Sequence, residues 1–166
     1  FIVGEKSYIL KSGQGIFINT QRIHMAKSVG DKDCIYHSVI FNPKLLKTFP
    51  GSIIEQKYID PVITADNLNS IEIYGENKWE KEALKFIMDI ITADISKSRG
   101  YELEIYINLM RFWLLLVLNE NDIFSQKTEP KPINEERVKD VLSFIHKNYS
   151  NKINLQDIAD SVFVSK

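Results

Sequence analysis

Cysteine is nearly absent from the sequence, since Cys34 is the only one among 166 residues. A disulfide framework within the chain is therefore excluded, and the composition fits a reducing compartment. We expect Cys34 to be an inert, buried strand residue. An excess of one charge is also missing, because 21 Lys and Arg face 22 Asp and Glu. The chain as a whole thus has no electrostatic attraction for nucleic acid or for an anionic membrane.

Long hydrophobic runs are missing too. The longest, from Ile105 to Leu118, is short for a bilayer span of roughly 20 residues, and it contains Asn108 and Arg111. We interpret it as a buried helix of a cytoplasmic protein with no membrane partner. The sequence also lacks a Gly-rich phosphate loop, a nucleophile elbow and paired catalytic carboxylates, so we expect no enzymatic activity and no catalytic residues.

Residues 1–76 have the pattern of short strands. The stretches "KSYIL", "GIFIN", "CIYHSVIF", "SIIEQKYIDPVIT" and "SIEIY" are apolar or β-branched and are separated by Gly, Asn and Pro. They predict an antiparallel sandwich or small barrel, with a helical turn at "PKLLKTF". The chain begins with Phe1 inside strand-like sequence, and we expect further residues before it in the complete protein.

Residues 77–124 change to a helical period. Apolar residues of "NKWEKEALKFIMDIITADIS" share one face, "RGY" interrupts the pattern, and a second helix runs from Tyr101 to Leu118. Two helices with a short connection predict an antiparallel hairpin. The second helix is apolar nearly all round at its end, which predicts a homodimer contact through Trp113, Leu114, Leu116 and Val117. In the alternative, the first helix and the sheet cover all four side chains.

Residues 125–133 are interpreted as a linker because two prolines keep the stretch extended. Residues 134–166 are helical again, with Asn134 as the cap of a first helix. Its apolar stripe comprises Val138, Val141, Leu142, Ile145 and Tyr149. Asn154 caps a second, short helix, with Asp157 in its first turn. The apolar stripe of this second helix comprises Leu155, Ile158, Ala159 and Val162.

The stretch "RVKDVLSFIHKNYSNKINLQDIADSVFVSK" resembles the start of the DNA-binding domain of the AraC/XylS family of bacterial transcription regulators. A helix-turn-helix needs a small residue where its helices approach closely, and Ala159 has that place. The resemblance implies that the recognition helix opens with Ser165 and Lys166, which are predicted to contact double-stranded DNA. We expect the rest of that helix after Lys166. Residues 134–166 contain five Lys and Arg against five Asp and Glu, so this piece alone should bind DNA poorly.

The segment "GQGIFINTQRIH" is similar to the second cupin motif, with Gly13 and His24 at matching positions. Asn19 and Gln21 replace its Pro and Gly, and Ser28 replaces its final Asn. Many AraC/XylS regulators have a cupin-type sensor barrel followed by a dimerising hairpin. The order of barrel, hairpin, linker and helix-turn-helix in this chain matches theirs.

These patterns together predict an α+β protein. It comprises a partial cupin-like β domain (1–76), a helical hairpin (77–124), a linker (125–133) and the start of an all-α helix-turn-helix domain (134–166). The hypothesis is a transcription factor that responds to a small-molecule effector. Candidate effector-binding residues are His24, His37, Tyr36 and Tyr8, whereas core packing is the preferred interpretation for Phe17 and Phe41.

One alternative hypothesis is a metal-dependent cupin enzyme with a helical tail, and another is a binding or dimerisation module with no role on DNA. A metal cupin gathers three or four ligands, and His24 alone is not a metal site. We therefore expect no bound metal and no cofactor.

Overall fold

The computed structural model of the protein describes residues 1–30, 33–65, 67–119, 133–149 and 151–161. The chain forms two compact units, Phe1–Thr128 and Glu129–Lys166. In the first unit, the β zone and the helical hairpin share one hydrophobic core. This mixture of helix and sheet is compatible with the predicted α+β class. No helix within the described residues is both long and apolar enough to cross a membrane.

The strands of the first unit form two small antiparallel sheets. β1 (Ile2–Val3) lies between β2 (Lys6–Ser7) and β4 (His24–Met25). β3 (Gly15–Ile18) pairs with β5 (Ser70–Ile73), which confirms the strands predicted in "GIFIN" and "SIEIY". "KSYIL" contributes only the two residues of β2. Neither sheet closes on itself within the described residues, so a cupin-like barrel is not shown.

The strand predicted in "CIYHSVIF" is wrong. Residues 33–42 contain no helix or strand, and most of their side chains are exposed. Cys34 is exposed rather than buried. The side chains favour a strand, but within the described residues no neighbouring strand pairs with this segment to satisfy its backbone groups. Only Val39 and Phe41 pack against the core.

The extended structure predicted in "SIIEQKYIDPVIT" is also wrong, because this segment is helical. A short 3-10 turn (Pro43–Leu45), as predicted in "PKLLKTF", precedes a π-helical turn, η2 (Glu55–Ile59), which continues into α1 (Asp60–Ile63). The side chains facing the core are Ile54, Ile59, Val62 and Ile63. Their spacing is that of a helix, which the β-branched composition concealed.

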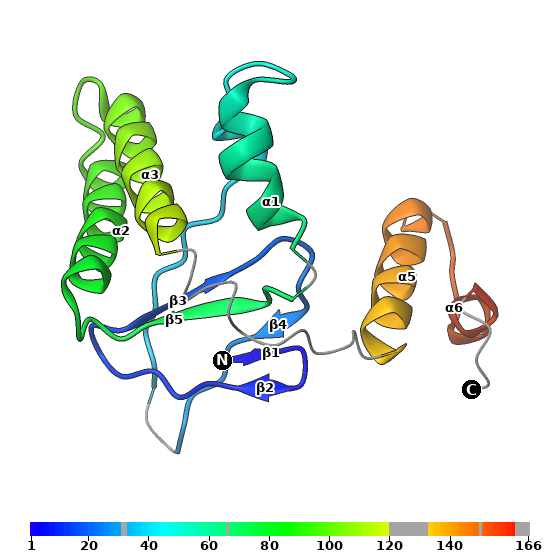
Figure 1. Ribbon diagram of the computed structural model, residues 1–166. Helices are drawn as coiled ribbons and strands as arrows, with labels where there is room; N and C mark the ends of the chain where they lie inside the picture. The colour runs from blue at the N-terminus through cyan, green and yellow to red at the C-terminus, as the bar shows by residue number, and fades with distance from the viewer. Residues whose placement is uncertain (31–32, 66, 120–132, 150, 162–166) are drawn as a thin grey trace. The chain divides into compact units, whose positions relative to one another are not determined.

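The hairpin is confirmed as predicted. α2 (Lys78–Ser96) begins where the Asn77 side chain accepts a hydrogen bond from the Glu80 amide at 3.0 Å, a standard N-cap. It ends at Lys97, whose φ of +47° breaks the helix. α3 (Tyr101–Leu118) then returns beside α2. Figure 1 shows this hairpin and α1 on the same side of the β3–β5 sheet.

The loop after β3 holds the end of α1. The buried Asn19 side chain donates to the carbonyls of Val62 at 2.8 Å and Leu68 at 3.1 Å. Thr20 donates to the carbonyl of Ile63 at 2.7 Å, and Arg22 to a carbonyl just beyond the helix. Carbonyls at the end of a helix lack its regular i+4 amide partners, so these side chains supply further donors to them.

We expect Leu116→Ala to lower the free energy of unfolding of the first unit by about 2–5 kcal/mol, because it empties a fully packed site. Leu116 is 0% exposed, whereas Leu118 in the same helix is 69% exposed. The matched variant Leu118→Ala should therefore stay within about 0.5 kcal/mol of the wild type.

Urea unfolding followed by tryptophan fluorescence measures this difference. Both tryptophans, Trp79 and Trp113, belong to the first unit, so the signal reports that unit. Equal losses for the two variants would contradict the placement of Leu116 in the core.

Candidate functional site

Three of the four predicted effector-binding residues lie around β1 and the adjacent Phe1. The Tyr8 carbonyl accepts from the Phe1 amino group at 2.8 Å, and the Tyr36 ring meets the Phe1 ring edge-on at 5.5 Å. His24 belongs to β4, which pairs with β1. His24, Tyr36 and His37 are exposed. The structure thus places three of the four residues near one strand and encloses none of them.

The described residues include no group of three or more His, Cys, Asp or Glu side chains that could hold a metal ion. The Nδ1 atom of His24 instead donates to the Arg22 carbonyl at 2.9 Å.

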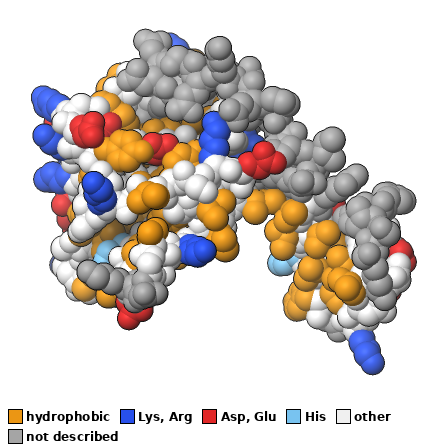
Figure 2. All heavy atoms as spheres, turned by 90° about the horizontal axis from the view of Figure 1, so that it is seen from below, with side chains coloured by type: hydrophobic (Ala, Val, Ile, Leu, Met, Phe, Trp, Pro, Cys, Tyr) orange, Lys and Arg blue, Asp and Glu red, His pale blue; other side chains and the backbone are white. Residues whose placement is uncertain are grey.

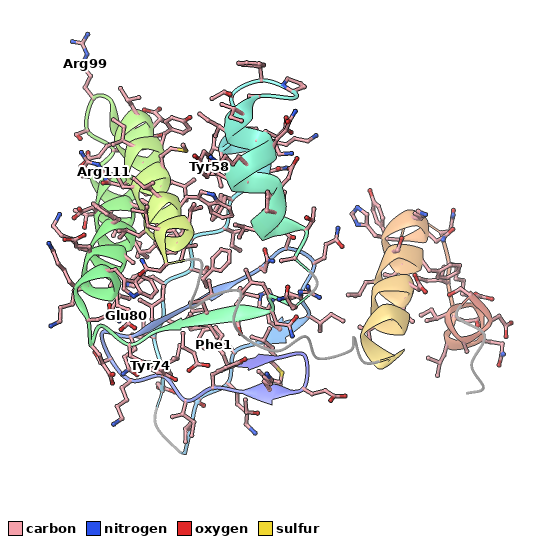
Figure 3. All side chains as sticks on the ribbon, viewed as in Figure 1. Phe1, Tyr58, Tyr74, Glu80, Arg99 and Arg111 are labelled. Carbon is pink, nitrogen blue, oxygen red and sulfur yellow. The ribbon has the colours of Figure 1, made fainter. Side chains whose placement is uncertain are left out.

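A mostly apolar groove of about 430 Å³ lies between α3 and the helical segment formed by η2 and α1. That volume is within the range of small-molecule sites. Figure 3 labels Tyr58 on the helical segment, beside α3, and Arg111 on α3. The lining residues are Ile54, Tyr58, Ile59, Tyr106, Ile107, Met110, Arg111, Trp113, Leu114 and Val117.

Three contacts fix the wall of the groove. The Trp113 indole N–H donates to the Tyr58 carbonyl at 2.9 Å, which ties α3 to η2. On the other side of η2, the Lys47 ammonium contacts Glu55 at 2.6 Å and Asp60 at 2.8 Å. These hydrogen bonds, that to Asp60 most of all, raise the pKa of Lys47 above its ordinary value. The bond from Lys47, followed by one from the Gly51 amide, lowers the pKa of the Glu55 carboxyl.

The four residues predicted for dimerisation separate into two pairs. Trp113 and Leu116 are 3% and 0% exposed and belong to the core, so they have no surface to offer a partner. Leu114 is 54% exposed, and Val117 is half-buried in the groove wall.

The groove residues Tyr58, Tyr106, Ile107 and Met110 were not predicted. On α3, the lining residues Ile107, Met110, Leu114 and Val117 are three, four and three residues apart. This spacing is the feature of the sequence that could have indicated a second apolar face on the helix.

The second unit contains two helices. α5 (Ile133–Asn148) begins one residue before the predicted cap, and α6 is Leu155–Ser161. The cap at Asn154 is confirmed, since its side chain accepts from the amides of Gln156 at 2.8 Å and Asp157 at 3.1 Å. The Asp157 carboxylate accepts in return from the Asn154 amide at 2.9 Å, which completes a reciprocal capping box.

Ala159, predicted where the helices of a helix-turn-helix approach each other, is 6% exposed. Leu155, predicted on the buried stripe, is 66% exposed. Several apolar side chains of α5 are exposed as well, and Figure 2 shows hydrophobic side chains gathered on this unit. In α5 they include Val138 at 43% and Leu142 at 54%, and Tyr149, which directly follows the helix, is 76% exposed. Val162 and the predicted DNA contacts Ser165 and Lys166 lie outside the described residues.

Comparison with known proteins gives one informative match. No family model and no solved structure matches the chain. The chain is 28% identical, over all of its 166 residues, to a Bacillus subtilis (strain 168) protein named "Uncharacterized HTH-type transcriptional regulator YdeC". The match covers 55% of that protein, so the chain spans about half the length of this relative. The similarity supports a transcription regulator.

The Lys47 network predicts how the stability of the groove wall depends on pH. Glu55 has a lowered pKa, so its contribution is present above the ordinary value of 4.5 and is lost as the pH falls through the folded value. Lys47 has a raised pKa, so its contribution is present below the ordinary value of 10.5 and is lost as the pH rises through the folded value. The network's contribution to the free energy of unfolding should therefore be constant between the ordinary pKa values of Glu55 and Lys47. It should decrease at lower and at higher pH.

Urea midpoints from tryptophan fluorescence across this pH range test the expectation. Lys47→Met should reduce both losses, whereas Lys44→Met, which removes an exposed lysine nearby, should leave the profile unchanged. Identical profiles for all three proteins would show that the network contributes nothing.

The capping box of α6 gives a local prediction. Asn154→Ala should destabilise α6 by about 1 kcal/mol, because two helix amides lose their acceptor. Amide hydrogen exchange of residues 155–161 measures the effect, with Asn151→Ala in the preceding turn as the control. Unchanged protection in Asn154→Ala would contradict the cap.

Proposed function

We propose that this chain is part of an AraC-type transcription regulator that binds double-stranded DNA as a homodimer and responds to a small-molecule effector. The observation that carries the proposal is the second unit. It contains a helix, a short turn and a second, capped helix with a buried alanine. This is the form of the first part of a helix-turn-helix domain, before its recognition helix. The similarity to a protein named as an HTH-type regulator supports it independently.

DNA recognition in this proposal depends on a helix that opens with Ser165 and Lys166. In a helix-turn-helix, the second helix lies in the major groove and reads base edges, while neighbouring groups contact phosphates. The described residues of α5 and α6 supply the supporting helices, and the turn into the recognition helix lies outside the described residues. The exposed apolar side chains of α5 fit this arrangement, because a helix-turn-helix domain packs further helices against its first one.

Effector binding is proposed for the first unit, with Tyr8, Tyr36, His24 and His37 as its polar groups. Tyr8 and Tyr36 both contact Phe1, and His24 follows on the neighbouring strand β4. Homodimerisation is proposed through α3, where Leu114 and Val117 remain accessible on the groove side. An effector would then act by changing how the dimer presents its two DNA-binding domains.

Fluorescence anisotropy with the regulator's own upstream DNA tests the proposal, using protein expressed from the complete reading frame. Specific binding should weaken by about 10³-fold or more between about 50 mM and 200 mM salt if six or more phosphates are contacted. Lys166→Ala should weaken binding and reduce the salt slope by about one, as loss of a single phosphate contact does.

Lys97→Ala provides the matched control, because Lys97 lies at the tip of the α2–α3 hairpin in the other unit. Binding that is weak and equal on scrambled DNA would refute the proposed function. A chain containing only residues 1–166 should bind poorly in the same assay.

A further inference from the structure

A polar hollow of about 530 Å³ lies between α3 and α2, beside the turn that joins the two helices. Its volume is within the range of small-molecule sites. Two acidic residues, Asp89 and Glu104, and two basic residues, Arg99 and Arg111, contribute to its lining. Because the two signs of charge are present in equal number, the hollow favours neither a net anion nor a net cation.

The side chain of Asn108 gives the hollow a buried polar group. Asn108 is 5% exposed and lines the hollow, and both polar atoms of its carboxamide retain some accessible surface. Within the described part of the chain this carboxamide forms no hydrogen bond. A buried amide without a partner is destabilising, and a carboxamide offers two donors and an acceptor oxygen. The unused hydrogen-bonding groups of Asn108 therefore point to a ligand in the hollow.

Two charged side chains flank Asn108 along α3. Glu104 precedes it by four residues and Arg111 follows it by three, so all three lie on one face of the helix. Among the described residues, neither Glu104 nor Arg111 forms an ion pair. The Arg111 guanidinium lies 5.8 Å from the centre of the Phe86 ring on α2. The hollow thus presents a carboxylate, a carboxamide and a guanidinium in a row.

The other two charged residues of the lining are less able to bind a ligand. The Asp89 carboxylate is already paired with the Lys85 ammonium at 2.8 Å. Figure 3 shows Arg99 directed away from the hairpin at its tip. Glu104 and Arg111 are therefore the charges that a ligand beside Asn108 would meet.

We propose that this hollow binds a short zwitterionic peptide, two or three residues long. Its terminal ammonium group pairs with Glu104, and its terminal carboxylate pairs with Arg111, whose planar fork of donors matches a carboxylate. The peptide bond between these ends exchanges hydrogen bonds with the Asn108 carboxamide, which supplies both a donor and an acceptor. The peptide runs in the same direction as α3. This inference goes beyond the proposed function and does not depend on it.

The spacing along α3 sets the length of the ligand. From Glu104 to Arg111 the helix rises about 10.5 Å, at about 1.5 Å for each residue. Two extended residues span at most about 7 Å and three about 11 Å. The long side chains of Glu104 and Arg111 reach inward over the remaining distance. A single amino acid is shorter and has no peptide bond for Asn108.

Titration of the ¹⁵N-labelled 166-residue chain with glycylglycine, followed by ¹H–¹⁵N correlation spectra, tests the proposal. The side-chain NH₂ of Asn108 and the Nε–H of Arg111 should shift and saturate. N-acetyl-glycylglycine lacks the ammonium group and glycylglycine amide lacks the carboxylate, so each should bind about two- to fivefold more weakly, as the loss of an exposed ion pair predicts. Glycine, which has no peptide bond, should bind about tenfold more weakly.

Variants assign each end of the peptide to its partner. Glu104→Gln should remove the preference for glycylglycine over its N-acetyl form, and Arg111→Gln the preference over the amide. Asn108→Leu keeps a similar volume and should weaken glycylglycine binding about tenfold. Glu102→Gln and Lys81→Gln are the matched controls, because both charges belong to the same hairpin and neither residue lines the hollow.

Circular dichroism establishes that each variant is folded. The absence of a saturable shift up to the solubility limit of glycylglycine would overturn the proposal. So would equal affinity for glycylglycine and its two blocked forms, or unchanged preferences in Glu104→Gln and Arg111→Gln. Specific, salt-sensitive DNA binding by the complete protein alongside any of these results would leave the proposed function standing.

Discussion

The indole of Trp113 is the contact on which the first unit depends. Its ring meets Phe17 of β3 and Phe41 edge-on, at centroid distances of 6.0 and 6.3 Å, and its N–H reaches the Tyr58 carbonyl. One side chain thus joins the strand pair, the irregular segment before α1, the π-helical turn and α3. A buried aromatic residue with a satisfied polar atom fixes both distance and orientation. The position of α3, and with it the surface that α3 offers, follows from this junction.

A second set of contacts keeps the same elements from sliding. Asn19 is nearly buried and uses both ends of its amide, donating to two carbonyls and accepting from the Thr20 amide at 2.8 Å. The residue after β3 must therefore have a side chain that can donate to the end of a helix, as the Asn19 amide does.

Several elements were predictable because one local signal determines them. Asn77 and Asn154 cap their helices, and the strands around Phe17 and Ile71 have unambiguous composition. The segment around Tyr58 was misjudged because β-branched residues favour a strand locally, whereas burial of Ile59 and Val62 against α3 and the strands selects a helix. Trp113 and Leu116 illustrate the same limit of prediction from local sequence. Composition identifies an apolar helix, but only packing determines which side chains become core and which remain outside.

The π-helical turn has a consequence for sequence divergence. Its backbone bond runs from the Asp60 amide to the Glu55 carbonyl, one residue further than in an α-helix. Deleting one residue there would restore the α-helical bond pattern and rotate the preceding side chains, including Ile54, by roughly 100° about the helix axis. The core on the far side, which Ile59 and Val62 anchor, would stay in place. Single-residue gaps at this turn are thus a route by which related proteins can change the wall of the groove while inheriting the same core.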